Sequence, residues 1–258
     1  MLGRGSSELV VFGRRAVLDA LAAETARVHA VRVSRRVPAD WRRRLARACG
    51  EAGAELETVR PEQVSDLSRE PRHDQGVAAR VQLRALQEVE SFVDSCKGER
   101  ARRPVRVMAL DGITNSQNIG MIVRSAVASG IDAVLWPTVG SPWVNGLVVK
   151  SSASTVFRCP IVRCESLIQG IFELQAAGFV SVGLASDAPL SLWDWPVSHR
   201  VVFVVGSETT GLSDDVSKLL DASLSIPMHS GVESLNVAVA ASLVCFHLAE
   251  PLAAGSRR

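Results

Sequence analysis

The stretch VRVMALDGITNSQNIGMIVRSAVASG (residues 105–130) decides the fold class of this chain. It opens with a near-continuous apolar run, residues 105–111, which is typical of a strand buried on both faces of a parallel sheet. Apolar residues then recur with helical spacing from Ile119 to Val127, which predicts an amphipathic helix, and Gly130 is a suitable residue to end it. A buried strand followed by such a helix is the repeating unit of a parallel α/β domain.

Strand and helix patterns alternate through the rest of the chain. Strand-like runs follow at residues 132–137, 161–163 and 179–186. Helical stretches such as residues 165–177 separate them, and this alternation predicts a parallel α/β domain over residues 105–250, followed by a tail, residues 251–258. With 258 residues, the chain is long enough for this domain and a smaller one.

Residues 1–84 carry a weaker alternation of the same kind. VHAVRVS (28–34) and GVAARVQ (76–82) alternate as strands do, and residues 38–52 have helical character after a leading proline. We therefore expect a small α/β domain over these 84 residues. The polar and charged residues 85–104 predict a helix plus linker between the two domains.

A net charge of +2 conceals a strongly basic N-terminal region. The first 50 residues contain 11 Arg against 4 acidic residues, a local excess of +7. Charge alone fits either a solvated basic face or a nucleic-acid surface. The use of Arg rather than Lys favours phosphate, whose oxygens match the guanidinium fork. The best candidates for contacts to nucleic-acid phosphates are Arg35, Arg36, Arg42, Arg43 and Arg44.

The five cysteines are scattered and odd in number, so they imply no disulfide framework. Cys159 and Cys164 lack a second pair or a nearby His cluster, which indicates buried structural thiols rather than a metal site. No stretch approaches the roughly 20 apolar residues that cross a bilayer, and the N-terminus has no signal-peptide core. We therefore expect a cytoplasmic protein with no metal and no membrane partner.

Two Gly/Ser-centred loops in the last third of the chain carry most of the functional signal. They lie in VVFVVGSETTGLSDD (201–215) and SLSIPMHSGVESLNVAVAASLVCFHLAE (223–250), each between an apolar run and the start of a helix. This arrangement presents backbone groups to a ligand at the carboxyl ends of strands. GSETTGLS (206–213) is nearly a P-loop, but Leu212 replaces the required Lys and Glu208 adds a negative charge, which argues against a nucleoside triphosphatase. The chain also lacks a G-x-G-x-x-G after a strand and a G-x-S-x-G elbow, which argues against dinucleotide-binding and hydrolase classes.

Three segments taken together resemble a known family. NSQNIGMIVRSA (115–126), VVGSETTGLS (204–213) and SIPMHSGVESLNVAVAAS (225–242) closely resemble, in order and content, the three motifs of the SpoU/TrmH family of RNA 2′-O-methyltransferases in the SPOUT superfamily. FGRRAVLDAL (12–21) and HDQGVAARV (73–81) resemble pieces of the small RNA-binding domain that precedes the catalytic domain in ribosomal-RNA members. The resemblance implies a deep trefoil knot, S-adenosylmethionine bound in the knotted loops, and methyl transfer to a ribose 2′-hydroxyl. It also implies a homodimer whose active site draws on both subunits.

The same resemblance implies the roles of individual residues. The catalytic residues would be Arg124, Asn118, Glu208, Ser234 and Asn236. The cofactor contacts would be Leu184, Gly206, Ile226, Met228 and Leu235. An arginine is a poor general base because its pKa normally exceeds about 12, so Arg124 is expected to orient the hydroxyl and stabilise the developing alkoxide.

Structural readings of these residues stay open beside the functional ones. Arg124 also fits a surface ion pair, and Asn118, expected just before the helix, also fits an N-cap. Ser234 also fits a cap for the last helix, whose later positions are apolar almost all round and so predicted to be buried. Among the expected cofactor contacts, Ile226, Met228 and Leu235 have side chains of the kind that is also found in a hydrophobic core.

Two departures from the family pattern concern loop shape. Ser154 stands where many members have Gly, and Thr209 stands where Gly or Lys is common.

Large-subunit (23S) ribosomal RNA is the preferred substrate, in routine maintenance or in antibiotic resistance. The alternatives are a tRNA ribose 2′-O-methyltransferase, a base methyltransferase, and a non-catalytic RNA-binding protein that retains the fold.

Overall fold

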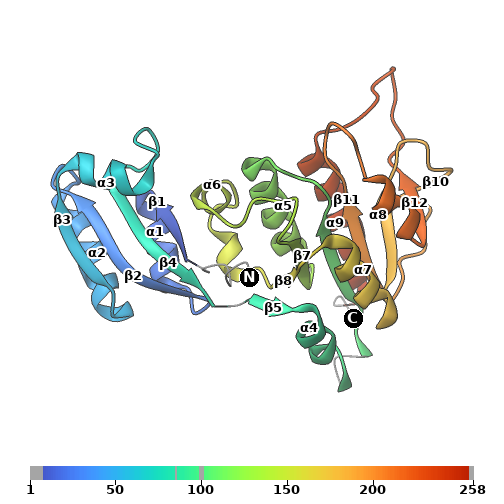
Figure 1. Cartoon of the computed structure of the whole chain (residues 1–258), viewed down its shortest axis with the longest axis horizontal. Coiled ribbons are helices and arrows are strands. Elements are labelled where there is room, and N and C mark those ends of the chain that lie inside the picture. Colours follow the sequence, from blue (N-terminus) through green and yellow to red (C-terminus); the bar gives the residue numbers. More distant parts are fainter. Residues whose placement is uncertain (1–7, 85, 99–101, 256–258) are drawn as a thin grey trace. The chain divides into compact units, whose positions relative to one another are not determined.

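The computed structural model describes residues 8–84, 86–98 and 102–255, with side chains up to residue 249, and it divides the chain into two compact units (Figure 1). The N-terminal unit comprises the chain up to residue 85 together with Val144–Arg158. The C-terminal unit comprises Leu86–Trp143 and the chain from Cys159 onward. Val144–Arg158 thus belongs to the N-terminal unit although it lies in the middle of the sequence.

The N-terminal unit is built on a four-stranded sheet of order β1-β4-β2-β3. Its strands are β1 (Glu8–Phe12), β2 (Ala26–Ser34), β3 (Glu55–Val59) and β4 (Val77–Leu83). Its first three helices are α1 (Arg14–Ala22), α2 (Ala39–Ala52) and α3 (Pro61–Ser68). The strands predicted over residues 28–34 and 76–82 and the helix predicted over residues 38–52 are confirmed.

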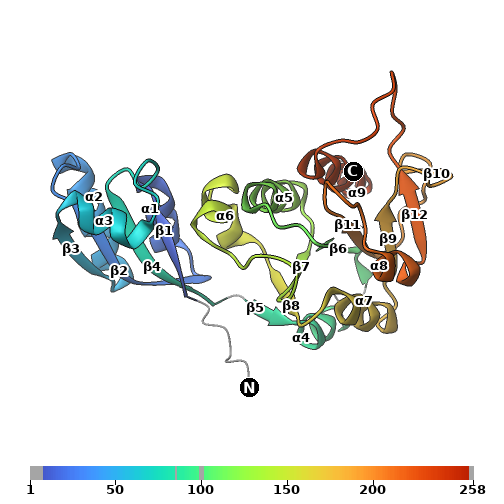
Figure 2. The ribbon, with the colours of Figure 1, turned by 45° about the horizontal axis from the view of Figure 1, so that its top comes forward.

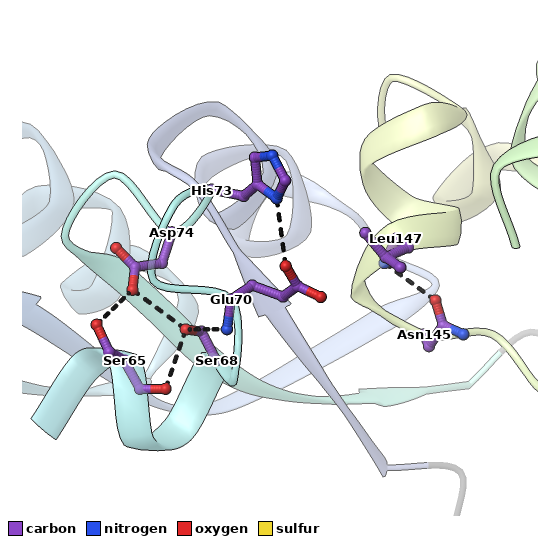
Figure 3. Close-up of polar contacts among 7 residues, drawn as sticks. All are labelled: Ser65, Ser68, Glu70, His73, Asp74, Asn145 and Leu147. Carbon is purple, nitrogen blue, oxygen red and sulfur yellow. Dashed lines mark hydrogen bonds and ion pairs between the residues drawn. The ribbon is translucent and has the colours of Figure 1, made fainter. Parts of the chain in front are cut away.

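The segment Val144–Arg158 adds two short helices to this unit, α6 (Gly146–Ser151) and the 3-10 helix η2 (Thr155–Arg158). Asn145 caps α6, accepting hydrogen bonds from the backbone N–H of Leu147 at 3.0 Å (Figure 3) and of the next residue. A Cβ added to Gly146 would lie 2.3 Å from a ring carbon of Phe12, so only glycine fits there. Ser154 adopts a φ of 63°, a left-handed conformation that favours glycine.

The C-terminal unit contains an eight-stranded sheet of order β10-β12-β9-β11-β6-β7-β8-β5. All its pairings are parallel, which confirms the predicted α/β class. Its strands are β5 (Leu86–Glu88), β6 (Val105–Leu110), β7 (Ala133–Pro137), β8 (Ile161–Cys164), β9 (Val180–Leu184), β10 (Leu190–Ser191), β11 (Arg200–Val205) and β12 (Ala222–Ser225). Its helices are α4 (Val89–Ser95), α5 (Ser116–Ser129), α7 (Leu167–Ala176), α8 (Asp214–Leu219) and α9 (Val237–Gly255).

Helices cover both faces of this parallel sheet (Figure 2). On one face α4, α7 and α8 bury side chains against alternate residues of β6, such as Val105 and Val107. On the other, α5 and α9 pack against each other, and Ser125 and Ser242 share a hydrogen bond of 2.7 Å between their hydroxyls. Every residue of β6 and β7 is buried, as the apolar runs predicted.

Three local expectations need correction or extension. The N-cap of α5 is Asn115, whose side chain accepts from the N–H groups of the residues two and three positions on, whereas Asn118 lies within the first turn. Helix α9 is not buried all round, because Val239 and Phe246 are 49% and 54% exposed, and it continues to Gly255. Part of the predicted linker, β5 and α4, is built into the C-terminal unit.

Candidate functional site

A cavity of about 720 Å³ opens at the carboxyl ends of β9, β11 and β12, which are neighbours in the parallel sheet. Three loops line it, one after each strand, at residues 184–187, 205–212 and 225–235. Its volume is within the range of about 300–1,000 Å³ that small-molecule sites occupy. The two loops singled out from the sequence therefore meet in one cavity, together with a third.

The loop after β11 is closed on itself. Ser207 and Gly211 exchange two backbone hydrogen bonds of 3.0 Å each. A Cβ added to Gly206 would lie 2.2 Å from the carbonyl carbon and oxygen of Gly211, so only glycine permits this approach of two backbone segments. The tight turn brings the backbone of residues 206–211 to the cavity wall.

Asp111 anchors the same loop, and sequence reasoning missed it. Its carboxylate is 8% exposed and accepts a hydrogen bond of 2.6 Å from the backbone N–H of Ser213. Its own N–H donates to the carbonyl of Val205 at 2.9 Å. The available signal was its position directly after β6, because the carboxyl ends of the parallel neighbours β6 and β11 meet at one edge of the sheet.

Three of the predicted catalytic residues form one polar network. The amide of Asn118, which is 5% exposed, donates to the Oε1 of Glu208. The Asn236 amide donates to the same Oε1 at 3.2 Å and to the Oδ1 of Asn118 at 3.3 Å. Asn236 also accepts from the N–H of Ala238 at 3.0 Å, so it is Asn236, rather than Ser234, that caps α9. Two side-chain amides therefore fix the position of the Glu208 carboxylate.

The other two predicted catalytic residues lie apart from this network. Ser234 is exposed at the cavity wall. Arg124 is exposed on α5, is not part of the cavity wall, and has no hydrogen-bond partner among the residues that the structure describes. A single chain thus assembles four of the five residues around the cavity and its rim.

All the predicted cofactor contacts line the cavity, namely Leu184, Gly206, Ile226, Met228 and Leu235. Three carboxylates also line it, those of Glu208, Asp187 and Glu233, and no Lys or Arg is among the described residues of its wall. Apolar side chains beside carboxylates suit a cationic ligand with a flat apolar part and disfavour a phosphate. Asp187 and Glu233 escaped sequence reasoning, since nothing local distinguishes them from solvated surface acids.

The thiols do not extend the site. Burial raises the pKa of Cys159, Cys164 and Cys245 to about 12, so these thiols stay protonated at neutral pH. Among the described residues, no group of three or more His, Cys, Asp or Glu side chains is placed to hold a metal ion. Within the same part of the chain, no helix has the length and apolar character needed to cross a membrane.

The predicted RNA contacts lie in the N-terminal unit. Arg35 and Arg36 are exposed just after β2, and Arg43 and Arg44 are exposed on α2. Arg42 is half-buried, and its Nε lacks a partner among the described residues. The cluster has the charge and exposure that a nucleic-acid surface needs.

Comparisons with known proteins agree across both units. The model of the SpoU rRNA Methylase family matches residues 105–246, and that of the RNA 2′-O ribose methyltransferase substrate-binding family matches residues 10–86. A 23S rRNA (guanosine-2′-O-)-methyltransferase RlmB of Xanthomonas campestris is 34% identical over 197 residues, which is 75% of this chain and 77% of that protein. An uncharacterized tRNA/rRNA methyltransferase of Mycobacterium sp. strain KMS is 32% identical over 241 residues, 93% of this chain and 76% of its own length. The crystal structure of the SpoU methyltransferase AviRb from Streptomyces viridochromogenes in complex with AdoMet superposes with a TM-score of 0.80 at 25% identity, covering 96% of this chain and 91% of that one.

Proposed function

This chain belongs to the SpoU rRNA methylase family, and from that premise we propose that it methylates a ribose 2′-hydroxyl of large-subunit (23S) ribosomal RNA. It is an S-adenosylmethionine-dependent RNA 2′-O-methyltransferase. The ribosomal substrate is supported by the RlmB relatives and by the match of the N-terminal unit to the substrate-binding family.

One observation carries the assignment to this cofactor, namely the chemistry of the cavity wall. S-adenosylmethionine supplies an electrophilic methyl group on a positively charged sulfur. The carboxylates of Glu208, Asp187 and Glu233 favour such a cation, and the absence of Lys or Arg from the described wall residues avoids repulsion. Leu184, Ile226 and Leu235 would offer apolar contacts to the adenine, and the turn at Gly206 would offer backbone groups.

The residues of this chain act mainly by positioning. Glu208, held by the amides of Asn118 and Asn236, keeps a fixed negative charge at the rim of the cavity. An arginine is a poor general base, so we assign Arg124 to orienting the 2′-hydroxyl and stabilising the alkoxide that develops there. The exposed Ser234 adds a hydroxyl group to the wall of the cavity. With S-adenosylmethionine bound, holding the attacking oxygen near the methyl group would supply most of the acceleration, and the hydroxyl proton would pass to solvent as the methyl–sulfur bond breaks.

A homodimer explains why Arg124 lies outside the cavity of its own chain. Met121, Val239 and Phe246 are 41%, 49% and 54% exposed on the packed pair α5 and α9, and Arg124 is one turn from Met121 on α5. A second copy covering this apolar face would bring Arg124 to the partner's cavity. Sedimentation should therefore show a dimer for the native chain and a monomer for Phe246→Glu, with methyl transfer lost in the monomer. A native chain that is monomeric and active would refute this arrangement.

Two further features stay proposals. We propose the trefoil knot, supported by the return of α9 from β12 to pack on α5 and β11. We also propose the boundaries 1–84, 85–104 and 105–250 as functional divisions, and a cytoplasmic location, where ribosomal RNA is modified. The family matches, residues 10–86 and 105–246, fall within these limits or within two residues of them.

The test combines cofactor binding with product mapping. Calorimetry should show binding of S-adenosylmethionine, and mass spectrometry of 23S ribosomal RNA treated with the purified enzyme should yield one nucleoside methylated on its ribose. A base-methylated nucleoside would refute ribose transfer, and efficient modification of tRNA alone would refute the ribosomal substrate. If the protein did not bind S-adenosylmethionine at millimolar concentration, the result would refute the enzyme and favour a non-catalytic RNA-binding protein. RNA affinity should also fall steeply with salt if the arginines neutralise phosphates.

A further inference from the structure

Trp41 belongs to the basic helix α2 and has no part in the methyl-transfer site. Its side chain is half-buried, whereas the side chains that α2 buries are Leu45 and Cys49. Its indole N–H has no hydrogen-bond partner among the described residues. The ring thus lies at the edge of the core, partly open to solvent, among the exposed arginines of the same helix.

Two guanidinium groups from different helices lie against this ring. The Cζ of Arg44, one turn along α2, is 5.3 Å from the ring centroid, and the Cζ of Arg14, at the start of α1, is 5.7 Å from it. Both distances are within the roughly 6 Å at which a cation interacts with an aromatic face. Trp41, Arg14 and Arg44 therefore form one cluster of flat groups, which we call the Trp41 cluster.

Arg14 is held in this cluster by a residue distant in sequence. Its Nε donates to the carbonyl of Gln75 at 3.2 Å, and its backbone N–H donates to the Oε1 of the same residue at 3.1 Å. The second bond supplies the N-cap of α1, which Gly13 has no side chain to make. The position of Arg14 thus depends on the turn that carries Gln75.

A buried carboxylate builds that turn (Figure 3). Asp74 is 5% exposed, and it accepts from the N–H of Gly76 at 2.8 Å and from the hydroxyls of Ser65 and Ser68 at 3.0 and 3.2 Å. Gly76 has a φ of 76°, and a Cβ there would lie 2.8 Å from the side chain of Val37. The HDQG segment thus has a shape that few other sequences allow, and this shape fixes Arg14 beside Trp41.

We propose that the Trp41 cluster is a stacking site for one unpaired nucleobase of the RNA substrate, an inference that rests on the proposed function. Nucleobases stack on aromatic rings and on guanidinium planes, and each such contact changes affinity by roughly tenfold to a hundredfold. The exposed Arg35, Arg36 and Arg43 supply positive charge for the adjoining phosphates. Because paired bases hide their faces in a helix, the base comes from a loop or bulge.

The protein side is tested with variants that separate stacking from charge and from folding. Trp41→Leu keeps an apolar side chain and removes the ring, and it should raise the KM for RNA about tenfold or more while kcat and S-adenosylmethionine affinity stay unchanged. Trp41→Phe should restore most of the RNA affinity. Arg44→Lys keeps the charge but removes the plane, so it should also weaken binding, whereas Arg47→Lys on the same helix should not. Thermal melting checks that each variant folds.

The RNA side is tested by a scan of abasic substitutions in a fragment of the 23S substrate, with binding followed by fluorescence anisotropy in the absence of cofactor. Removing the base at one unpaired position should lower the affinity of the native protein for the RNA. The same abasic substitution should cause no further loss of affinity in Trp41→Leu, because the two changes remove the same contact. Native-like RNA affinity of Trp41→Leu, or equal losses at that position in both proteins, would overturn the stacking site. A native protein that binds RNA but transfers no methyl group would instead overturn the proposed function.

Discussion

Gly206→Ala tests whether the closed loop after β11 forms the cofactor cradle. The added Cβ would lie 2.2 Å from backbone atoms of Gly211, against the 3.4–4 Å of ordinary contact, so the loop must open by more than 1 Å. Backbone atoms cannot rotate away as a side chain can. Opening breaks the two hydrogen bonds between Ser207 and Gly211, worth about 1 kcal/mol each. The total of about 2 kcal/mol corresponds to a roughly thirtyfold weaker affinity for S-adenosylmethionine.

Calorimetric titration of S-adenosylmethionine into the native and variant proteins measures this loss directly. Gly50→Ala is the matched control, since the same methyl group at Gly50 meets no atom within 4 Å and φ at Gly50 is outside the left-handed region that favours glycine. It should leave cofactor affinity unchanged and leave stability equal or slightly higher. If Gly206→Ala, folded by circular dichroism, bound the cofactor as tightly as the native protein, the close backbone approach would not be part of the cradle.

Three other predictions address catalysis, the amide network and stability. Arg124→Ala should lower kcat by about a hundredfold or more with S-adenosylmethionine affinity unchanged. A single-turnover rate constant for methyl transfer near that of the native protein would show that Arg124 takes no part in the chemical step. Asn236→Ala deletes two donors to the network and the cap of α9, so it should lower the free energy of unfolding by about 1–3 kcal/mol in urea titrations and reduce kcat; a purely structural role would leave kcat unchanged. For Asp221, burial raises the pKa, but the N–H and hydroxyl of Ser181 and the amide of Gln175 outweigh it and hold the pKa below its usual value. The stability that Asp221 contributes is therefore complete above the unfolded pKa of about 3.9 and is lost as pH falls through the lower folded value. Urea titrations at several acid pH values should show the gap between native and Asp221→Asn closing as pH falls, and a gap independent of pH would contradict this.

Local pattern sufficed for the parallel sheet and for the two loops. The run from Val105 is apolar at nearly every position because β6 is buried on both faces, and this pattern is typical of strands in parallel sheets. The residues expected to contact the cofactor needed the family resemblance, since Leu184 and Ile226 look like ordinary core residues. Their shared cavity depends on the adjacency of β9, β11 and β12, which no local pattern reveals.

The errors also arise from long-range contacts. Asn118 resembles a helix cap in sequence, but Asn115 already caps α5, and Asn118 bonds a residue 90 positions away instead. The apolar character of α9 predicts burial, yet Val239 and Phe246 remain exposed in the single chain. Composition says which side chains avoid water, and it does not say whether the same chain or another covers them.

The placement of Val144–Arg158 in the N-terminal unit has a consequence for synthesis on the ribosome. The chain passes between the two units at residues 85, 143 and 158, so the N-terminal unit cannot be completed until residue 158 has left the exit tunnel. Until then Phe12 lacks the glycine of α6 that packs on its ring. The first 84 residues expressed alone would leave that apolar surface open, and a fragment for RNA-binding work would be more soluble with α6 and η2 supplied.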